Sequence, residues 1–258
     1  MNLLYSCVKS PYLYGGFAQK IVIPAGFWLH KLPDNVPLDV GALAEPLAVA
    51  VRAIERIASP GTPHMQMGLG IGTSVLVQGA GSIGLLVAIC AKLSGAKVTI
   101  LDKIQERLDL AKSIGIKNTF NVTRESSDQL IERIKDMDNG IGPDAVIEAT
   151  GELDSIPFGL KLLRRGGKYL ELGNFVDVGN ISIKPSFICQ NDLEFVGSVL
   201  GSPQDYSRVM YILSESGIPF KRLITHRFDL EHTENAILNA KARNGLKSII
   251  LPNGENYD

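Results

Sequence analysis

Cysteine is scarce in this chain of 258 residues. The three cysteines lie far apart in the sequence: Cys7, Cys90 and Cys189. An odd and widely spaced set is not typical of a disulfide framework, which is a feature of oxidising compartments. We therefore expect a cytoplasmic protein. Cys90 lies inside an apolar helical run, so we expect it to be a core residue.

Metal-ligand spacing, long apolar runs and unbalanced charge are lacking as well. None of the histidines forms a ligand pair of the H-x-x-x-H type: His30, His64, His226 and His232. The most apolar stretch, residues 83–91, is too short to cross a bilayer, and the N-terminal residues lack the apolar core of a signal peptide. Lys and Arg number 26 against 27 Asp and Glu, which argues against a nucleic-acid surface. We expect neither a membrane nor a nucleic-acid partner.

The sequence does contain a regular alternation of apolar strands and helices over residues 41–200. Such alternation is typical of βαβ units and a parallel sheet. We predict an α/β fold with a Rossmann doubly wound parallel sheet in this region. Strands are expected at residues 74–78, 97–101, 119–122, 144–148, 168–172 and 193–199, and helices at residues 44–57, 82–93, 104–114, 128–137 and 156–163.

The two flanking regions have different patterns. Residues 1–40 are rich in proline, glycine and aromatic residues, and the alternating run at residues 17–23 predicts a strand. Residues 201–258 contain two helical patterns and a final apolar strand at residues 248–251, which Pro252 ends.

A glycine-rich turn joins the strand at residues 74–78 to the following helix. Gly79, Gly81 and Gly84 match the pattern G-x-G-x-x-G. The first glycine allows the tight turn, the second a close approach of the backbone to a pyrophosphate, and the third close packing of helix and strand. Ser82 and Ile83 open the helix, whose N-terminal N–H groups attract phosphate. We predict a dinucleotide site here rather than a purely structural turn.

An acidic residue at the end of the next strand selects the cofactor. Asp102 follows Gly84 at the spacing expected for a carboxylate that accepts hydrogen bonds from the ribose hydroxyls of NAD. Lys103 and Arg107 are close to it in sequence, so a site for a 2′-phosphate stays open as an alternative. Asp102 also has the simpler interpretation of an N-cap for the next helix. We favour NAD.

Three further segments have two interpretations each. The turns at residues 149–151 and 172–174 follow predicted strands, where ligands of α/β sheets bind, but ordinary connecting turns have the same composition. Glu45 and Pro46 form an acidic first turn with proline, which by itself indicates helix capping.

Taken together, residues 14–251 resemble the zinc-type medium-chain dehydrogenase/reductase family, which includes alcohol, sorbitol and threonine dehydrogenases. The motifs occur in the family's order: GGFA at 15–18, IVIP at 21–24, HKLP at 30–33, ALAEPLAV at 42–49, VLVQGAGSIGL at 75–85 and LITHRF at 223–228. The resemblance implies an NAD-dependent alcohol or polyol dehydrogenase that transfers hydride between a secondary alcohol and NAD, with zinc as a Lewis acid.

The resemblance also implies a domain organisation and roles for single residues. Residues 1–40 would be a remnant of a GroES-like, β-rich catalytic domain, residues 41–200 the NAD-binding domain, and residues 201–258 a return to the catalytic domain. The implied contacts are the ribose for Arg107, the nicotinamide side for Thr150, Leu172 and Ser198, the pyrophosphate for Lys247, the catalytic zinc for Glu45, and a structural-zinc lobe for Cys7. A solvated surface lysine is an equal alternative for Lys247.

The sequence departs from the family in one respect. Relatives carry the zinc-ligand cysteine, a His-Glu pair and a Ser/Thr proton relay ahead of the element at residues 15–18, and these have no counterpart here. We therefore expect a fragment or a natural truncation that does not retain zinc, and we assign no catalytic residue. A non-catalytic NAD-binding module and a zinc-independent, NADPH-dependent reductase are the alternatives. A homodimer or homotetramer is expected, because in relatives the strand matching residues 193–199 pairs across a dimer.

Overall fold

The computed structural model describes residues 15–23, 25–58 and 68–254. Cys7 lies outside these residues, so its predicted place in a zinc lobe stays a prediction. The chain forms two compact units, one from residues 1–43 and 213–258 and the other from residues 44–212. The predicted division into 1–40, 41–200 and 201–258 stays a prediction. Among the described residues, no helix has the length and apolar character needed to span a membrane.

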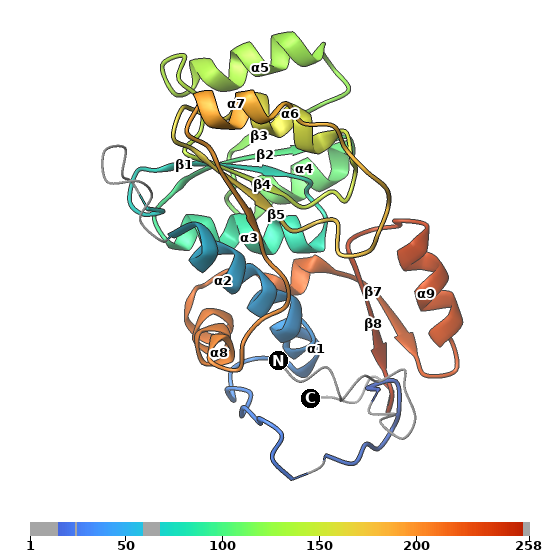
Figure 1. The fold of residues 1–258 in the computed structure, drawn as a ribbon. Coiled ribbons are helices and arrows are strands. Elements are labelled where there is room, and N and C mark those ends of the chain that lie inside the picture. The colour runs from blue at the N-terminus through green and yellow to red at the C-terminus, as the bar shows by residue number, and fades with distance from the viewer. Residues whose placement is uncertain (1–14, 24, 59–67, 255–258) are drawn as a thin grey trace. The chain divides into compact units, whose positions relative to one another are not determined.

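The larger unit is built on a six-stranded parallel sheet with the strand order β3-β2-β1-β4-β5-β6 (Figure 1). This order reverses direction between β1 and β4, as in a doubly wound sheet. The predicted Rossmann fold is thus confirmed. The strands are β1 (Ser74–Gln78), β2 (Lys97–Asp102), β3 (Asn118–Asn121), β4 (Ala145–Glu148), β5 (Lys168–Glu171) and β6 (Glu194–Gly197).

Helices cover both faces of this sheet. Figure 1 shows α2 and α3 on one face and α5, α6 and α7 on the other. Their bounds are α2 (Ala44–Ala58), α3 (Ser82–Leu93), α4 (Gln105–Ser113), α5 (Ser127–Asp136), α6 (Ser155–Leu162) and α7 (Pro185–Gln190). α8 (Asp205–Glu215) crosses the boundary between the two units.

The core of this unit lies at β1 and α3. Val75, Leu76 and Val77 of β1 are fully buried, as are Leu85 and Leu86 of α3. A strand that has neighbouring strands on both sides and helices on both faces exposes neither face to solvent. For this reason the sequence of β1 is a continuous apolar run. The glycine turn therefore joins two deeply buried elements of the unit.

The smaller unit contains a second, two-stranded parallel sheet. β7 (Ile224–Asp229) pairs with β8 (Lys247–Leu251), and α9 (Thr233–Lys241) connects them. A helical crossover is what two parallel strands require. The unit also contains α1 (Leu38–Gly41) and a 3-10 helix at Phe220–Leu223. Sequence patterns predicted α9 and β8 but did not assign β7, whose side chains are mostly polar.

The strand predicted at residues 17–23 is wrong. This segment has no regular secondary structure, and its apolar side chains are largely exposed: Phe17, Ile21, Val22 and Ile23. An isolated strand is unstable in water because its backbone groups need a neighbouring strand, and no described strand pairs with this segment. The alternating pattern therefore had nothing to pair with here.

Candidate functional site

The turn between β1 and α3 is held by backbone contacts to neighbouring strands. The N–H group of Gly79 donates to the carbonyl of Leu101 at 2.7 Å. Gly79 has a φ of +99°, and a Cβ at this position would lie 3.0 Å from the carbonyl oxygen of Ala149. Both the backbone conformation and the close approach therefore require glycine.

The other two glycines of the turn differ in what requires them. A Cβ on Gly84 would lie 1.8 Å from the carbonyl oxygen of Gly79, so the fold itself excludes any other residue. Gly81 has an ordinary φ of −72°, and the nearest atom to a Cβ there is a guanidinium nitrogen of Arg107 at 3.9 Å. Protein packing therefore leaves open space over Gly81, beside a cationic side chain.

Gly81 is also the N-cap residue of α3, and no side chain caps this helix. The first-turn N–H groups of a helix lack intrahelical partners, and the helix dipole makes this end positive. An anion over Gly81 would meet both the N-terminus of α3, where Ser82 and Ile83 lie, and the guanidinium of Arg107. The structure thus brings four of the predicted residues to one place: Gly81, Ser82, Ile83 and Arg107.

Asp102 lies at the end of β2, next to this turn, and its side chain is nearly buried. Its Oδ2 accepts from the Ala80 N–H at 2.6 Å, and its Oδ1 accepts from the Ile104 N–H at 2.8 Å. The N-cap interpretation of Asp102 is wrong, because Ile104 is the N-cap residue of α4 and no side chain caps this helix. Each carboxylate oxygen has a second lone pair, so the group can still accept a hydrogen bond from a ligand hydroxyl. Lys103 points elsewhere, because its Nζ lies 3.5 Å from a Glu152 carboxylate oxygen.

A buried carboxylate organises the turn after β4. Glu148 has no exposed surface, and its Oε1 accepts from the Thr150 N–H at 2.6 Å and from Ser155 Oγ at 3.0 Å. The hydroxyl of Thr150 also donates to it, as does the Gly151 N–H at 3.2 Å. Thr150 therefore has its side chain and its amide committed to Glu148, which leaves its carbonyl for other contacts.

The turn after β5 contains a second carboxyl group, that of Glu171, which is half-buried and has its Oε2 atom shielded from solvent. Glu171 Oε1 accepts from the backbone N–H and the side-chain amide of Asn174, at 2.9 and 3.1 Å. Leu172 lies between them, and its N–H donates to the Glu148 carbonyl at 3.2 Å. Burial raises the pKa of Glu171 above its ordinary value, although the hydrogen bonds from Asn174 act in the opposite direction.

Several buried polar atoms at this sheet edge have no hydrogen-bond partner among the described residues: Glu171 Oε2, Asn174 Oδ1 and Ser198 Oγ. Buried polar atoms are rarely left unpaired, and an unoccupied ligand site is one explanation for such atoms. Sequence reasoning named Ser198 and included Asn174 in the candidate turn at residues 172–174, but it missed Glu148 and Glu171. Their signal in the sequence was an acidic residue at the last position of each of two neighbouring strands.

Two predicted residues do not join this group. Lys247 begins β8 in the unit formed by residues 1–43 and 213–258, so its contact with a pyrophosphate stays a prediction. Glu45 lies exposed in the first turn of α2, as in the capping interpretation. Within residues 15–23, 25–58 and 68–254, no three His, Cys, Asp or Glu side chains are grouped to hold a metal ion. A catalytic zinc uses three protein ligands, so these residues do not fit one.

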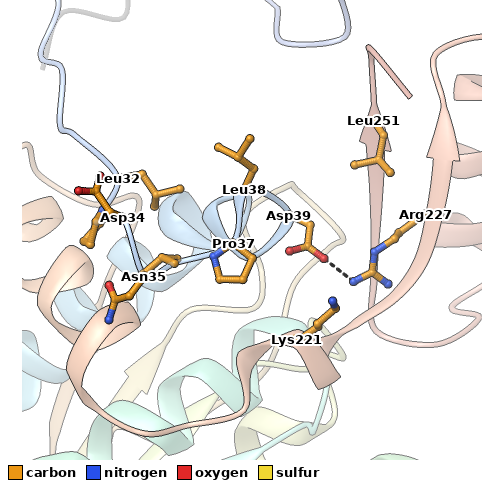
Figure 2. Close-up of a pocket in the computed structure, with 11 residues that line it drawn as sticks. Leu32, Asp34, Asn35, Pro37, Leu38, Asp39, Lys221, Arg227 and Leu251 are labelled. Carbon is orange, nitrogen blue, oxygen red and sulfur yellow. Dashed lines mark hydrogen bonds and ion pairs between the residues drawn. The ribbon is translucent and has the colours of Figure 1, made fainter. Parts of the chain in front are cut away.

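The smaller unit has a pocket of its own, of about 730 Å³ (Figure 2). One wall comes from residues 32–39 and the other contains Lys221, Arg227 and Leu251. Arg227 donates to Asp39 Oδ2 at 2.6 Å. Burial acts to raise the pKa of Asp39, but the hydrogen bonds from Arg227 and the Val40 N–H outweigh it and lower the pKa. None of the predicted cofactor residues lines this pocket.

Comparisons with known proteins agree with this geometry. A family model described as zinc-binding dehydrogenase matches residues 82–215. A probable D-xylulose reductase A from Neosartorya fischeri is 34% identical over 238 residues, which are 92% of this chain and 63% of that protein. The chain thus spans less than two thirds of this relative's length.

Solved structures of dehydrogenases are similar to this chain as well. An alcohol dehydrogenase from Thermotoga maritima matches with a TM-score of 0.79 and 30% identity, over 86% of this chain and 60% of that one. A putative zinc-binding dehydrogenase from Sinorhizobium meliloti, bound to NADP, matches with a TM-score of 0.75 and 25% identity, over 86% and 62% of the two chains.

Proposed function

The chain belongs to the zinc-binding dehydrogenase family, and from this premise we propose that residues 44–212 bind NAD for hydride transfer to and from a secondary alcohol or polyol. The relative from Neosartorya fischeri, by its name a D-xylulose reductase, supports a polyol or the corresponding ketose as the substrate class. Because the chain spans 63% of that relative, the activity of the whole enzyme is part of the proposal.

The open space over Gly81 is the observation that carries the proposal. Packing requires glycine at positions 79 and 84, but no protein atom lies within 3.9 Å of a Cβ at position 81. A ligand that approaches the backbone accounts for glycine there. The uncapped N-terminus of α3 and the guanidinium of Arg107 favour a pyrophosphate as that ligand.

Asp102 supports NAD rather than NADP. Its carboxylate is anchored by the amides of Ala80 and Ile104, so it cannot turn away from a ligand without losing both hydrogen bonds. A fixed negative charge accepts from the ribose hydroxyls of NAD and repels a 2′-phosphate. Lys103, which could offset that charge, is paired with Glu152. The NADP-bound relative is the reason to test both cofactors.

This arrangement assigns separate roles to the cofactor and to the residues of the chain. A bound nicotinamide supplies the hydride acceptor or donor. The residues of this chain bind and orient it: the α3 N-terminus holds the pyrophosphate, Asp102 holds the adenosine ribose, and the turns containing Thr150 and Leu172 form the wall on the nicotinamide side. Arg107, for which the resemblance implies a ribose contact, lies beside Gly81, so we assign it to the pyrophosphate instead. The described residues include no group of three His, Cys, Asp or Glu side chains that fits a catalytic zinc.

Titration of the purified 258-residue protein with NADH and with NADPH, followed by the fluorescence of the reduced nicotinamide, tests the proposal. We expect NADH to bind at least about tenfold more tightly, which corresponds to about 1.4 kcal/mol. Tighter binding of NADPH would overturn the choice of cofactor. Binding of neither would overturn the proposed function. Added ketose in the presence of bound NADH then reports whether this chain itself oxidises the cofactor.

A further inference from the structure

Two acidic side chains are in contact inside the larger unit. Glu148 and Glu171 are the last residues of β4 and β5 and are direct partners in the register of these strands. The side-chain amide of Asn174 lies 3.5 Å from Glu148 Oε2 and 3.1 Å from Glu171 Oε1, and the charge of Glu148 acts to raise the pKa of Glu171. No cation forms an ion pair with either in the described part of the chain. When two carboxyl groups share a site, the charge of one raises the pKa of the other, which favours a state with one proton between them.

The hydrogen bonds around the pair indicate which group is ionised. All of the other partners of Glu148 Oε1 are donors, and they include the amides of Thr150 and Gly151. Backbone amides cannot accept a proton, so Glu148 is the carboxylate. Glu171 Oε1 also accepts two hydrogen bonds, both from Asn174, but Glu171 Oε2 is buried without a donor. A proton on this oxygen, donated to Glu148, satisfies both groups.

The pair also joins two turns that lie far apart in the sequence. Glu148 holds the turn at residues 149–151 and Glu171 holds the turn at residues 172–174. The side-chain amide of Asn174 reaches both carboxyl groups, at 3.5 and 3.1 Å. A Cβ on Gly173 would lie 2.1 Å from Glu148 Oε2 and 2.5 Å from the amide nitrogen of Gly151, so the turns are in close contact.

We propose that Glu171 is protonated, donates its Oε2–H to the Glu148 carboxylate, and thereby positions the turns of Thr150 and Leu172 against the nicotinamide half of the cofactor. The positioning part rests on the proposed function. Both glutamates act through the turns they hold, so they are positioning residues. The proton that they share joins the two turns, and its loss leaves two facing carboxylates that repel each other.

The proposal has a defined pH dependence. Two titratable groups interact electrostatically with Glu171: Glu148 from β4 and Tyr169 from its own strand. From β6, the register partner of Glu171 is Gly197, which has no side chain. The pKa of Glu171 is raised in the folded protein, first by burial and then by the Glu148 charge. The folded state thus binds a proton that the unfolded state releases. Stability falls as pH rises from the ordinary glutamate pKa through the folded value.

Two amide variants separate the roles of the pair. In Glu171→Gln, the new amide N–H donates to Glu148 and its oxygen accepts from Asn174, which reproduces the protonated state at every pH. In Glu148→Gln, an amide N–H₂ group replaces one carboxylate oxygen. It cannot accept hydrogen bonds from the N–H groups and hydroxyls that donate to Glu148 in the wild type. The measurements are the thermal midpoint of the unliganded protein and the Kd for NADH, each between about pH 5 and about pH 9.

We expect the wild type to lose thermal stability and NADH affinity as pH rises. Glu171→Gln should abolish both trends relative to wild type and keep the acidic-pH Kd within about threefold. Glu148→Gln should weaken NADH binding at every pH by about tenfold or more, because it leaves buried donors without an acceptor. A Glu171→Gln protein with the pH profiles of the wild type would refute the shared proton.

The two proposals fail in distinguishable ways. If the wild type binds no NADH, the proposed function and the positioning role both fail, while the thermal profile of the unliganded protein still decides whether the proton is shared. If NADH binds and the thermal profile behaves as expected but the Kd does not follow it, the shared proton stands and the positioning role is refuted.

Discussion

Gly81→Ala is expected to weaken cofactor binding while leaving the fold intact. The backbone at this position has φ −72° and ψ −176°, which any residue adopts, and a new methyl group would meet no protein atom closer than 3.9 Å. Two effects on stability then oppose each other. Alanine restricts the unfolded chain, which stabilises by about 0.4–1 kcal/mol. Alanine is also a poorer N-cap than glycine, by roughly 0.5–1 kcal/mol.

The net change in the free energy of unfolding should therefore lie within about 1 kcal/mol of zero. For a chain of this size that is a change in Tm of no more than about 4 °C. The effect on binding is larger, because the methyl group occupies the space proposed for the pyrophosphate. Overpacking of one methyl group costs about 1–3 kcal/mol, which corresponds to a Kd for NADH raised roughly 5- to 150-fold.

Gly84→Ala is the matched control. The same methyl group at position 84 would lie 1.8 Å from the carbonyl oxygen of Gly79, a contact that no side-chain rotation relieves. We expect this variant to lose stability by several kcal/mol, seen as a lower Tm or as insoluble protein. Differential scanning fluorimetry and NADH titration of the two variants make the comparison. If the Gly81→Ala protein binds NADH as tightly as the wild type does, the proposed pyrophosphate site over Gly81 is refuted.

Three further outcomes are expected for the larger unit. Tyr169→Phe removes a hydrogen bond of 3.1 Å to the buried Gln78 side chain, so urea unfolding should show a loss of about 1–2 kcal/mol, and an unchanged midpoint would contradict that bond. Asp144→Ala breaks a largely buried ion pair of 2.6 Å with Arg164. It should lower the free energy of unfolding by about 2 kcal/mol after allowance for the partial exposure of the pair. An unchanged free energy of unfolding would show that the pair is not stabilising. Burial raises the pKa of the Cys90 thiol to about 12, so alkylation at about pH 8 followed by peptide mass spectrometry should find this cysteine unmodified until the protein is unfolded.

Sequence patterns were most informative where the chain is buried on both sides. The apolar runs of β1, β2 and β4 and the glycine turn were predicted to within one or two residues. These features are local, because strand alternation, helix periodicity and a glycine turn are each set by adjacent residues. The site elements around Gly81 and Asp102 were predicted for the same reason.

Predictions failed where a neighbour in space decides the outcome. The alternating run at residues 17–23 has a strand pattern but no described strand partner, and it stays irregular. The polar residues of β7 gave no strand signal, and the pairing with β8 makes them a strand. The short helix α7 was missed as well, since six residues are too few to show a helical period.

The sequence by itself determined the order of strands and helices, the glycine turn and the acidic residue that follows it, because these depend on residues close together in the chain. The tertiary structure alone decided that packing requires Gly79 and Gly84, whereas Gly81 leaves room for a ligand. It also decided that Glu148 and Glu171, more than twenty residues apart, end neighbouring strands in register, where the side-chain amide of Asn174 reaches both carboxyl groups. Register and burial depend on the whole sheet, and no local pattern contains them.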